Sequence, residues 1–278
     1  MAKPQVLITG AGPTGLVLAL YLTAQNIPVR IIDKAAFSPS TSRALAVQPR
    51  TLELYQQLGL ADVVLDGGHR AKATNLWVGS QHRARIPVAE MGKGITPFPF
   101  IYIYPQDKHE RALEERLAEF GVAVERGVEL KEFVDYGDCV KATLSTPDGD
   151  EDVEFEYVVG CDGGRSTVRE SMEIGFEGGT YPQVFFVADI EGSGHIINGE
   201  IHIDVNDEDY LLVFGLKDPG TARLVGVISG QAAEDHESLT FADVSHRAID
   251  ALKINVTKVN WFSTYRVHHR VAEHFRQG

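Results

Sequence analysis

The glycine-rich segment Gly10-Ala11-Gly12-Pro13-Thr14-Gly15 constrains the fold of this chain more strongly than any other feature. A short apolar run precedes it at 6–9, a helical apolar pattern follows at 14–25, and a second strand pattern covers 29–33. These elements predict a βαβ unit, which implies a parallel sheet with a right-handed crossover. In that unit Gly10 permits the tight turn, Gly12 lets the backbone approach a pyrophosphate, and Gly15 allows close packing of the helix on the strand.

Asp33 stands at the end of the second predicted strand. An acid about 20 residues after such glycines can hydrogen-bond an adenosine ribose. The helix N-terminus beside the glycines also favours phosphate groups, because its N–H groups are unpaired and its dipole is positive there. Together these features predict a dinucleotide site, with FAD and NAD as alternatives. The simpler alternative is a glycine turn in an unrelated α/β protein.

The remaining sequence divides into two kinds of pattern. Up to about Gly178, helical patterns at 49–58 and 106–120 alternate with strand patterns at 73–88, 98–104, 122–125, 128–136, 139–145 and 153–160. Beyond it, strand patterns at 184–191, 200–205, 210–216 and 222–229 are joined by Gly, Asn, Asp and Pro turns, which indicates an antiparallel sheet. A helix over 241–252, a strand over 258–264 and a helix that begins within 270–276 are also expected.

We therefore predict an α/β fold in which a Rossmann-like FAD/NAD(P)-binding domain is interleaved with an antiparallel β-sheet domain. The first domain is expected to comprise residues 1–72 and 89–177 together with 266–278. The second is expected to comprise 73–88 and 178–265, because the strand patterns at 73–88 should join the later sheet.

Composition disfavours several function classes. In a chain of 278 residues, 26 Lys and Arg against 39 Asp and Glu give a net charge of −13, which disfavours binding to nucleic acids and to anionic membranes. The longest apolar stretch, at 15–22, is far shorter than the ~20 residues that span a bilayer. The first strand pattern begins too close to Met1 to leave room for a signal peptide. We therefore expect a cytoplasmic protein without a membrane or nucleic-acid partner.

Metal binding is also not expected. The two cysteines, Cys139 and Cys161, cannot form a disulfide framework or a four-thiolate zinc site. His268, His269 and His274 do not have the i, i+4 spacing of a helical zinc site.

A second motif, Gly160-Cys161-Asp162-Gly163-Gly164-Arg165-Ser166-Thr167-Val168-Arg169, follows a strand pattern and opens into a helix. It places Asp162 at the carboxyl end of a sheet, where α/β proteins bind ligands. Asp162 could accept hydrogen bonds from ribityl hydroxyls, and Arg169 could face a phosphate or pair with the loop. On spacing alone the better explanation is an Asx turn followed by a helix capped at Ser166.

The glycine motif, Asp33, Ser42-Arg43-Ala44 and the motif at 160–169 together resemble the FAD-dependent aromatic hydroxylases. These are single-component flavoprotein monooxygenases of the para-hydroxybenzoate, phenol or polyketide hydroxylase type. The resemblance runs in order over essentially the whole chain, and it implies an extended FAD with its AMP half on the first βαβ unit. It also implies NAD(P)H as a transient co-substrate, O₂, and a small aromatic substrate beneath the antiparallel sheet. A homodimer is left open.

The resemblance assigns cofactor-binding roles residue by residue. Gly10, Gly12, Pro13, Thr14 and Gly15 would hold the pyrophosphate, and Asp33, with Lys34 beside it, would hold the adenosine ribose. Arg43 would reach the cofactor from a loop, Gln106 would contact the ribityl chain, Val128 would meet the adenine through its backbone, and Asp162 would face the flavin and NAD(P)H. It implies no catalytic nucleophile or general base from the protein.

The resemblance implies that NAD(P)H reduces FAD and that O₂ then supplies an oxygen atom to an electron-rich ring. The chain stops before a third family motif, Gly-Asp-Ala-Ala-His, so we expect the N-terminal part of such an enzyme and weak retention of FAD. The alternatives are an FAD-dependent reductase or epoxidase on the same scaffold, and a non-catalytic fragment of the flavin domain.

Overall fold

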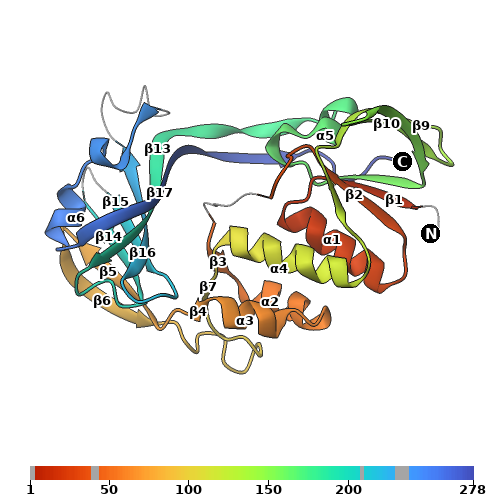
Figure 1. Ribbon diagram of the computed structural model, residues 1–278. Helices are drawn as coiled ribbons and strands as arrows, with labels where there is room; N and C mark the ends of the chain where they lie inside the picture. Colours follow the sequence, from red (N-terminus) through yellow and green to blue (C-terminus); the bar gives the residue numbers. More distant parts are fainter. Residues whose placement is uncertain (1–3, 39–43, 207–209, 229–237) are drawn as a thin grey trace.

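A four-stranded parallel sheet organises the half of the molecule that contains the glycine motif (Figure 1). The computed structural model describes residues 4–38, 44–206, 210–228 and 238–278. The strand order is β12-β1-β2-β8, formed by β1 (Val6–Thr9), β2 (Val29–Asp33), β8 (Val124–Arg126) and β12 (Tyr157–Gly160). This order places the carboxyl ends of β1 and β2 side by side, directly before the glycine motif and at Asp33.

Alternate residues of the parallel strands pack against different layers. Val6, Ile8 and Ile31 face a helical layer, formed by α1 (Pro13–Ala24), α2 (Pro49–Gln57), α3 (Ala61–Gly67) and α4 (Gln106–Glu119). Leu7 and Ile32 face a three-stranded antiparallel sheet, formed by β9 (Glu129–Asp135), β10 (Val140–Thr146) and β11 (Gly149–Phe155). This half of the molecule, called the nucleotide-binding half for the dinucleotide site that its sequence predicts, therefore has three layers, because strand side chains alternate between faces.

A seven-stranded sheet forms the other half of the molecule, with strand order β17-β13-β16-β15-β14-β5-β6. Its strands are β5 (Ala73–Val78), β6 (Gln81–Pro87), β13 (Phe176–Ser193), β14 (Ile201–Val205), β15 (Tyr210–Gly215), β16 (Thr221–Ile228) and β17 (Asn255–Ala272). β5 and β14 pair in parallel, whereas the other neighbours are antiparallel. The pairing of β5 with β14 inserts an early hairpin into a sheet of late strands, so the two halves are interleaved.

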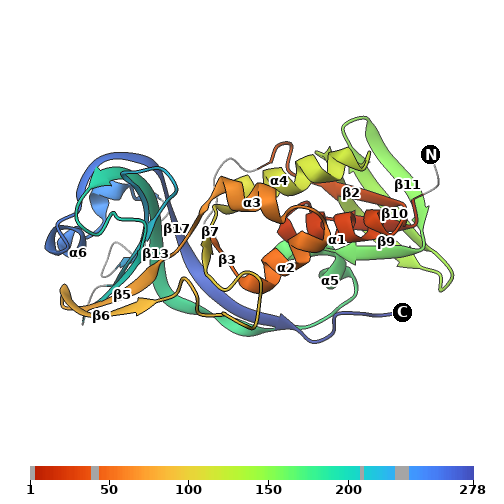
Figure 2. The same ribbon diagram turned by 90° about the horizontal axis from the view of Figure 1, so that it is seen from below.

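The two faces of this sheet have different neighbours. Val184, Phe186, Ala188 and Ile190 pack against α6 (Arg247–Ala251) and the segment around it. Figures 1 and 2 show α6 on the side of the sheet away from α1 and α4. The intervening residues of β13, such as Phe185 and Asp189, therefore point toward the nucleotide-binding half.

A small sheet joins the two halves, with the order β3-β7-β4. It consists of β3 (Ala46–Val47), β4 (His69–Arg70) and β7 (Tyr102–Ile103). Buried Ile103 of β7 packs in one cluster with Leu45, Ala71, Val88 and Ile201 of β14. Apolar contact between the halves is therefore centred on this sheet.

The predicted fold class is confirmed, and several predicted elements need correction. The helix expected to begin within 270–276 is wrong, because β17 continues to Ala272 in pairing with β13. The helix expected at 241–252 is divided into a 3-10 helix at Phe241–Asp243 and α6. The single strand expected at 153–160 is divided into β11, which already begins at Gly149, and β12.

Two predicted domain boundaries, at 177/178 and 265/266, fall inside the long strands β13 and β17. The structure also adds short elements that the sequence patterns did not indicate, namely α3, β3, β4 and a 3-10 helix at Gly163–Arg165, whereas the helix expected after the motif at 160–169 is present as α5 (Thr167–Ser171). None of the helices in the described ranges combines the length and the apolar character that crossing a membrane requires.

Candidate functional site

A cavity of about 250 Å³ opens where β1 and β2 end. Its lining brings together Gly10, Gly12, Asp33, Lys34, Val128 and Asp162, six of the residues that the sequence singled out. They come from the β1–α1 turn, the end of β2, the segment before β9 and the segment after β12. The cavity thus lies at the carboxyl edge of the parallel sheet, where α/β folds bind ligands.

The backbone of the glycine turn has the geometry that its residue types predict. Gly10 has φ +96°, and a Cβ on it would lie 2.3 Å from the carbonyl oxygen of Cys161. A Cβ on Gly15 would lie 1.9 Å from the carbonyl oxygen of Gly10. Gly12 differs, because its φ is −75° and a Cβ there would meet no atom within 4 Å. Packing therefore requires glycine at positions 10 and 15, whereas Gly12 leaves open space beside the start of α1.

Asp33 already holds two backbone groups in the structure. Its Oδ2 accepts the N–H of Ala11 at 2.7 Å, and its Oδ1 accepts the N–H of Ala35 at 2.8 Å. Nη1 of Arg126 lies 3.8 Å from the same carboxylate. Asp33 therefore stabilises the glycine turn as well as bordering the cavity, a structural role that the sequence did not reveal.

Asp162 has an unsatisfied oxygen beside the cavity. Its Oδ1 is buried and has no hydrogen-bond partner among the described residues, whereas its Oδ2 accepts the N–H of Val168 at 3.4 Å. The alternative based on local turns also holds, since Ser166 caps α5 by accepting the N–H of Arg169 at 3.0 Å. A buried carboxylate oxygen without a partner is costly, so Asp162 suits a ligand that brings hydroxyl donors.

The other predicted cofactor residues differ in how they lie relative to the cavity. Pro13 and Thr14 form the first turn of α1 beside the cavity, and α1 has no side-chain cap. The N–H of Val128 donates to the carbonyl of Asp33 at 3.1 Å, so this amide is already engaged. Gln106 does not line the cavity; its Nε2 donates to Glu110 at 2.7 Å. Arg43 lies outside the described residues.

Burial shifts the pKa of a thiol in the cavity lining and that of a carboxyl group on α4. Burial raises the pKa of the Cys161 thiol to about 11, so this cysteine is not a reactive thiolate. Burial also raises the pKa of Glu110 on α4, against the hydrogen bond from Gln106. Within the described part of the chain, no group of three or more His, Cys, Asp or Glu side chains is placed to hold a metal ion.

The face of the seven-stranded sheet that points toward the nucleotide-binding half, its inner face, carries side chains whose direction the sequence did not reveal. Phe185 of β13 stacks on Tyr265 of β17, with ring centroids 5.7 Å apart and planes at 26°. Tyr210 lies close to Tyr265, and burial raises its pKa. Trp261 pairs with Asp189 on the same face. These half-buried aromatic rings form a wall toward the nucleotide-binding half, and only strand register shows which side chains point inward.

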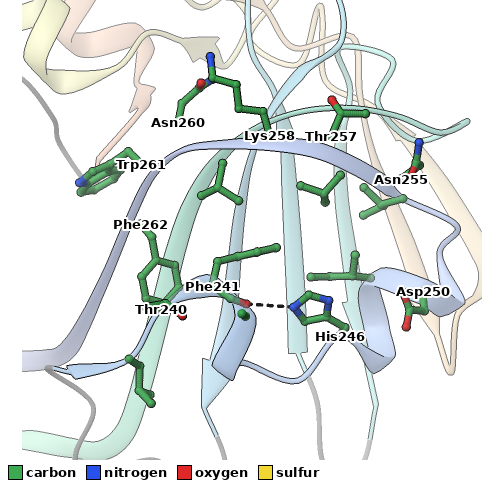
Figure 3. A pocket seen from close by; sticks show the side chains of 16 residues that line it. Thr240, Phe241, His246, Asp250, Asn255, Thr257, Lys258, Asn260, Trp261 and Phe262 are labelled. Carbon is green, nitrogen blue, oxygen red and sulfur yellow. Dashed lines mark hydrogen bonds between the residues drawn. The ribbon is translucent and has the colours of Figure 1, made fainter.

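A larger cavity, about 860 Å³, lies at the other side of this sheet (Figure 3). It is bordered by the segment from Leu239 to Asp250 and by the edge strand β17. Nε2 of His246 there is 3.0 Å from the carbonyl oxygen of Phe241, which holds the short helices together. This cavity lies away from the glycine turn and has none of the predicted cofactor residues in its lining.

Comparison with known proteins places the chain among flavoproteins. The family described as FAD binding domain matches residues 3–278. The 6-methylpretetramide 4-monooxygenase of Streptomyces rimosus is 35% identical over an alignment that covers 99% of this chain and 49% of that protein. The dialkyldecalin synthase of Streptomyces rugosporus is 28% identical over 98% of this chain and 57% of that protein. The chain thus spans about half the length of such curated relatives.

Among solved structures, p-nitrophenol 4-monooxygenase from Pseudomonas putida matches with a TM-score of 0.84 and 21% identity, over 99% of this chain and 71% of that one. At this identity the likeness shows the fold alone. The family match and the 35% identical relative each cover nearly the whole chain, and they confirm the resemblance read from the motifs. The chain therefore belongs to the FAD binding domain family, together with aromatic and polyketide monooxygenases.

Proposed function

We propose that this chain supplies the FAD-binding and substrate-facing parts of a flavoprotein monooxygenase that hydroxylates an aromatic or polyketide-like substrate. NAD(P)H and O₂ are the proposed co-substrates. The observation that carries the proposal is the cavity at the glycine turn, with open space at Gly12 and the unsatisfied Oδ1 of Asp162. The similarity to 6-methylpretetramide 4-monooxygenase supports the type of reaction.

The residues present fit an FAD molecule. Open space at Gly12 allows a pyrophosphate to approach the N-terminus of α1. The carboxylates of Asp33 and Asp162 offer acceptors for ribose and ribityl hydroxyls, and Lys34 and Val128, which line the same cavity, would lie beside the adenosine. Bound FAD would supply the electron transfer from NAD(P)H and the oxygen chemistry, while the chain binds, orients and shields the reacting groups.

We assign residues 1–72, 89–177 and 266–278 to FAD binding, and residues 73–88 and 178–265 to substrate binding. The inner face of the seven-stranded sheet supports the second assignment. Phe185, Tyr210, Trp261 and Tyr265 offer flat apolar surfaces against which an aromatic ring can stack. A wall of this kind excludes water from one side of a bound ring and orients it toward the nucleotide-binding half.

A pair of glycine substitutions tests the FAD site. Gly12→Ala places a methyl group in the open space of the cavity without contact to any other atom, so we expect normal stability and at least tenfold weaker FAD binding. Gly164→Ala is the matched control, because its Cβ also meets nothing within 4 Å but Gly164 does not line the cavity. FAD titration followed by flavin fluorescence measures both. Equal FAD affinity in the two variants would sink the assignment of Gly12.

The reaction is tested by product analysis. The protein is incubated with FAD, NADH or NADPH, ¹⁸O₂ and a set of mono- and polycyclic phenols. Label in a new phenolic hydroxyl is the expected result. Unlabelled reduced product supports a reductase instead. The similarity to dialkyldecalin synthase favours a second candidate, synthesis of a decalin ring system; if that synthesis needs no reductant, it predicts a ring-closed product with no NAD(P)H oxidation.

A further inference from the structure

One charged side chain of the seven-stranded sheet is almost completely removed from solvent. Arg223 of β16 is 1% exposed, and its guanidinium makes a two-pronged contact with Asp189 of β13, with Nε and Nη2 at 2.6 and 2.8 Å from the two carboxylate oxygens. The guanidinium also lies 5.4 Å from the ring centre of Trp261. All three side chains are on the inner face of the sheet, toward the nucleotide-binding half.

Arg223 reaches beyond its own sheet. Its Nη1 lies 3.3 Å from the carbonyl oxygen of Ala44, in the nucleotide-binding half. The same carbonyl accepts the N–H of Gln106, the first residue of α4, at 3.1 Å. One backbone oxygen thus joins a side chain of the sheet, the segment that leads into β3, and the start of α4.

Stability is a weak explanation for this arrangement. A buried ion pair is often no more stabilising than apolar residues of the same volume, because both charges must be desolvated. An arginine fork, in contrast, can hold a carboxylate with two donors and still direct a third donor elsewhere. Here the third donor is directed at Ala44, which directly follows Arg43, a residue expected to contact the cofactor.

We propose that Arg223 is a positioning residue, fixed by Asp189, that holds the Ala44 carbonyl and the start of α4 in place and thereby sets the affinity of the chain for FAD. The inference rests on the proposed FAD site. Asp189 and Trp261 lie on the aromatic wall on the inner face of the seven-stranded sheet. A change at this wall would therefore alter FAD binding through Arg223.

Arg223→Lys is the first test. A lysine keeps the positive charge for Asp189, but its single ammonium group cannot also reproduce the donor to Ala44. We expect amide hydrogen exchange at Gln106 to become at least tenfold faster in the FAD-free protein, and FAD binding to become at least tenfold weaker. The double variant Arg223→Met with Asp189→Asn removes both charges with little change in side-chain volume, so it leaves no unpaired buried charge while losing the same contact.

Arg85→Lys is the matched control. Arg85 of β6 also makes a two-donor contact, with Glu200 directly before β14, at 3.2 and 2.5 Å, at the opposite end of the same sheet. Its replacement should leave Gln106 exchange and FAD affinity as in the wild type. A general loss of stability would speed up hydrogen exchange at many amides. Faster exchange that is confined to Gln106 therefore indicates a local change at the start of α4.

The proposal is overturned if either the Gln106 exchange rate or the FAD affinity stays at the wild-type value in both Arg223 variants. It is also overturned if Arg85→Lys changes them equally. A wild-type chain that does not bind FAD would instead remove the proposed FAD site. Gln106 exchange would then decide alone whether Arg223 positions the start of α4.

Discussion

The glycines at positions 10, 12 and 15 stand in one turn and meet different constraints. Gly10 needs a positive φ and has a carbonyl where its Cβ would be, and Gly15 has the carbonyl of Gly10 in that position. Gly12 meets neither constraint. The motif therefore combines two positions set by the fold with one position left open for a ligand.

This difference predicts opposite behaviour for two substitutions. Gly15→Ala should lower the free energy of unfolding by about 1–3 kcal/mol, because the turn must shift to relieve the contact with the Gly10 carbonyl. Gly12→Ala should leave it within about 0.5 kcal/mol of the wild type. Urea unfolding followed by circular dichroism measures both. Similar losses in the two variants would show that the turn responds as a unit.

Asp162 is a better probe of FAD binding than Asp33. Asp33→Ala removes the acceptor for two backbone N–H groups, so its effect on FAD affinity is mixed with a loss of stability. Asp162→Ala removes one oxygen that has no partner among the described residues and another that accepts a single backbone N–H, that of Val168, at the long distance of 3.4 Å. We expect it to weaken FAD binding by about 1–3 kcal/mol, measured by calorimetry. Unchanged affinity would mean that the unsatisfied Oδ1 faces no part of the cofactor.

At this scale the sequence predicted six of the residues that line the cavity. Gly10, Gly12, Asp33, Lys34, Val128 and Asp162 meet there because each follows or precedes a strand of one parallel sheet. Gln106 was expected beside them, but the structure turns its side chain toward Glu110 along α4. The roles of Asp33 in the turn and of Arg223 in the other half depend on contacts between distant residues, which no local pattern reveals.

Among the elements, α2 and α4 share a buried polar contact that affects acid stability. The hydroxyl of Tyr55 contacts Nε2 of His109, and both side chains are buried. Burial lowers the pKa of His109 to about 4 and raises that of Tyr55. The folded protein therefore keeps a neutral imidazole that can accept the tyrosine proton in a hydrogen bond.

The acid dependence follows from the sign of this shift. Below about pH 6.5 the unfolded chain protonates His109, whereas the folded chain does so only near pH 4. Stability from this residue is thus complete above about pH 6.5 and falls by about 3 kcal/mol as the pH drops to about 4. Between pH 7 and 4, the free energy of unfolding of His109→Gln should therefore fall by about 3 kcal/mol less than that of the wild type. Urea titrations at constant ionic strength measure it. Parallel losses would contradict it.

A second buried histidine, His202 of β14, allows the same test of acid stability in the half formed by the seven-stranded sheet. Burial lowers its pKa to about 4 as well, and its ring accepts a hydrogen bond from Nε1 of Trp77 at 3.2 Å. His202→Gln should reduce the acid loss by a similar amount. If the two substitutions are additive, the two halves contribute separately to acid sensitivity.

The most instructive error at this scale concerns the end of the chain. Residues 270–276 have a helical composition, yet β17 continues to Ala272 because β13 offers it a partner as far as Phe176. Helix and strand propensities are weak compared with such pairing. The aromatic run at 98–104 was likewise expected to be a longer strand, but only Tyr102 and Ile103 pair with other strands.

For the whole molecule, the contact between the halves depends on few apolar side chains. Ile103 is 2% exposed and packs with Ile201 across the boundary. Ile103→Ala should cost about 2–5 kcal/mol of stability, as for other buried large-to-small changes. Ile95→Ala is the control, because Ile95 is 86% exposed and should cost less than about 0.5 kcal/mol. Equal thermal midpoints for the two variants would show that the halves do not depend on this cluster.

The interleaving of the two halves has a consequence for synthesis of the chain on the ribosome. β5 finds its parallel neighbour β14 only much later, since Asn75 and Ile201, which are hydrogen-bonded, are 126 positions apart. At about 5–20 residues per second, the β5–β6 hairpin waits roughly 6–25 s with one edge unpaired. Throughout that interval the nascent chain exposes a strand edge that can pair wrongly or recruit a chaperone. Fast elongation through residues 88–200 therefore favours a high yield of folded protein.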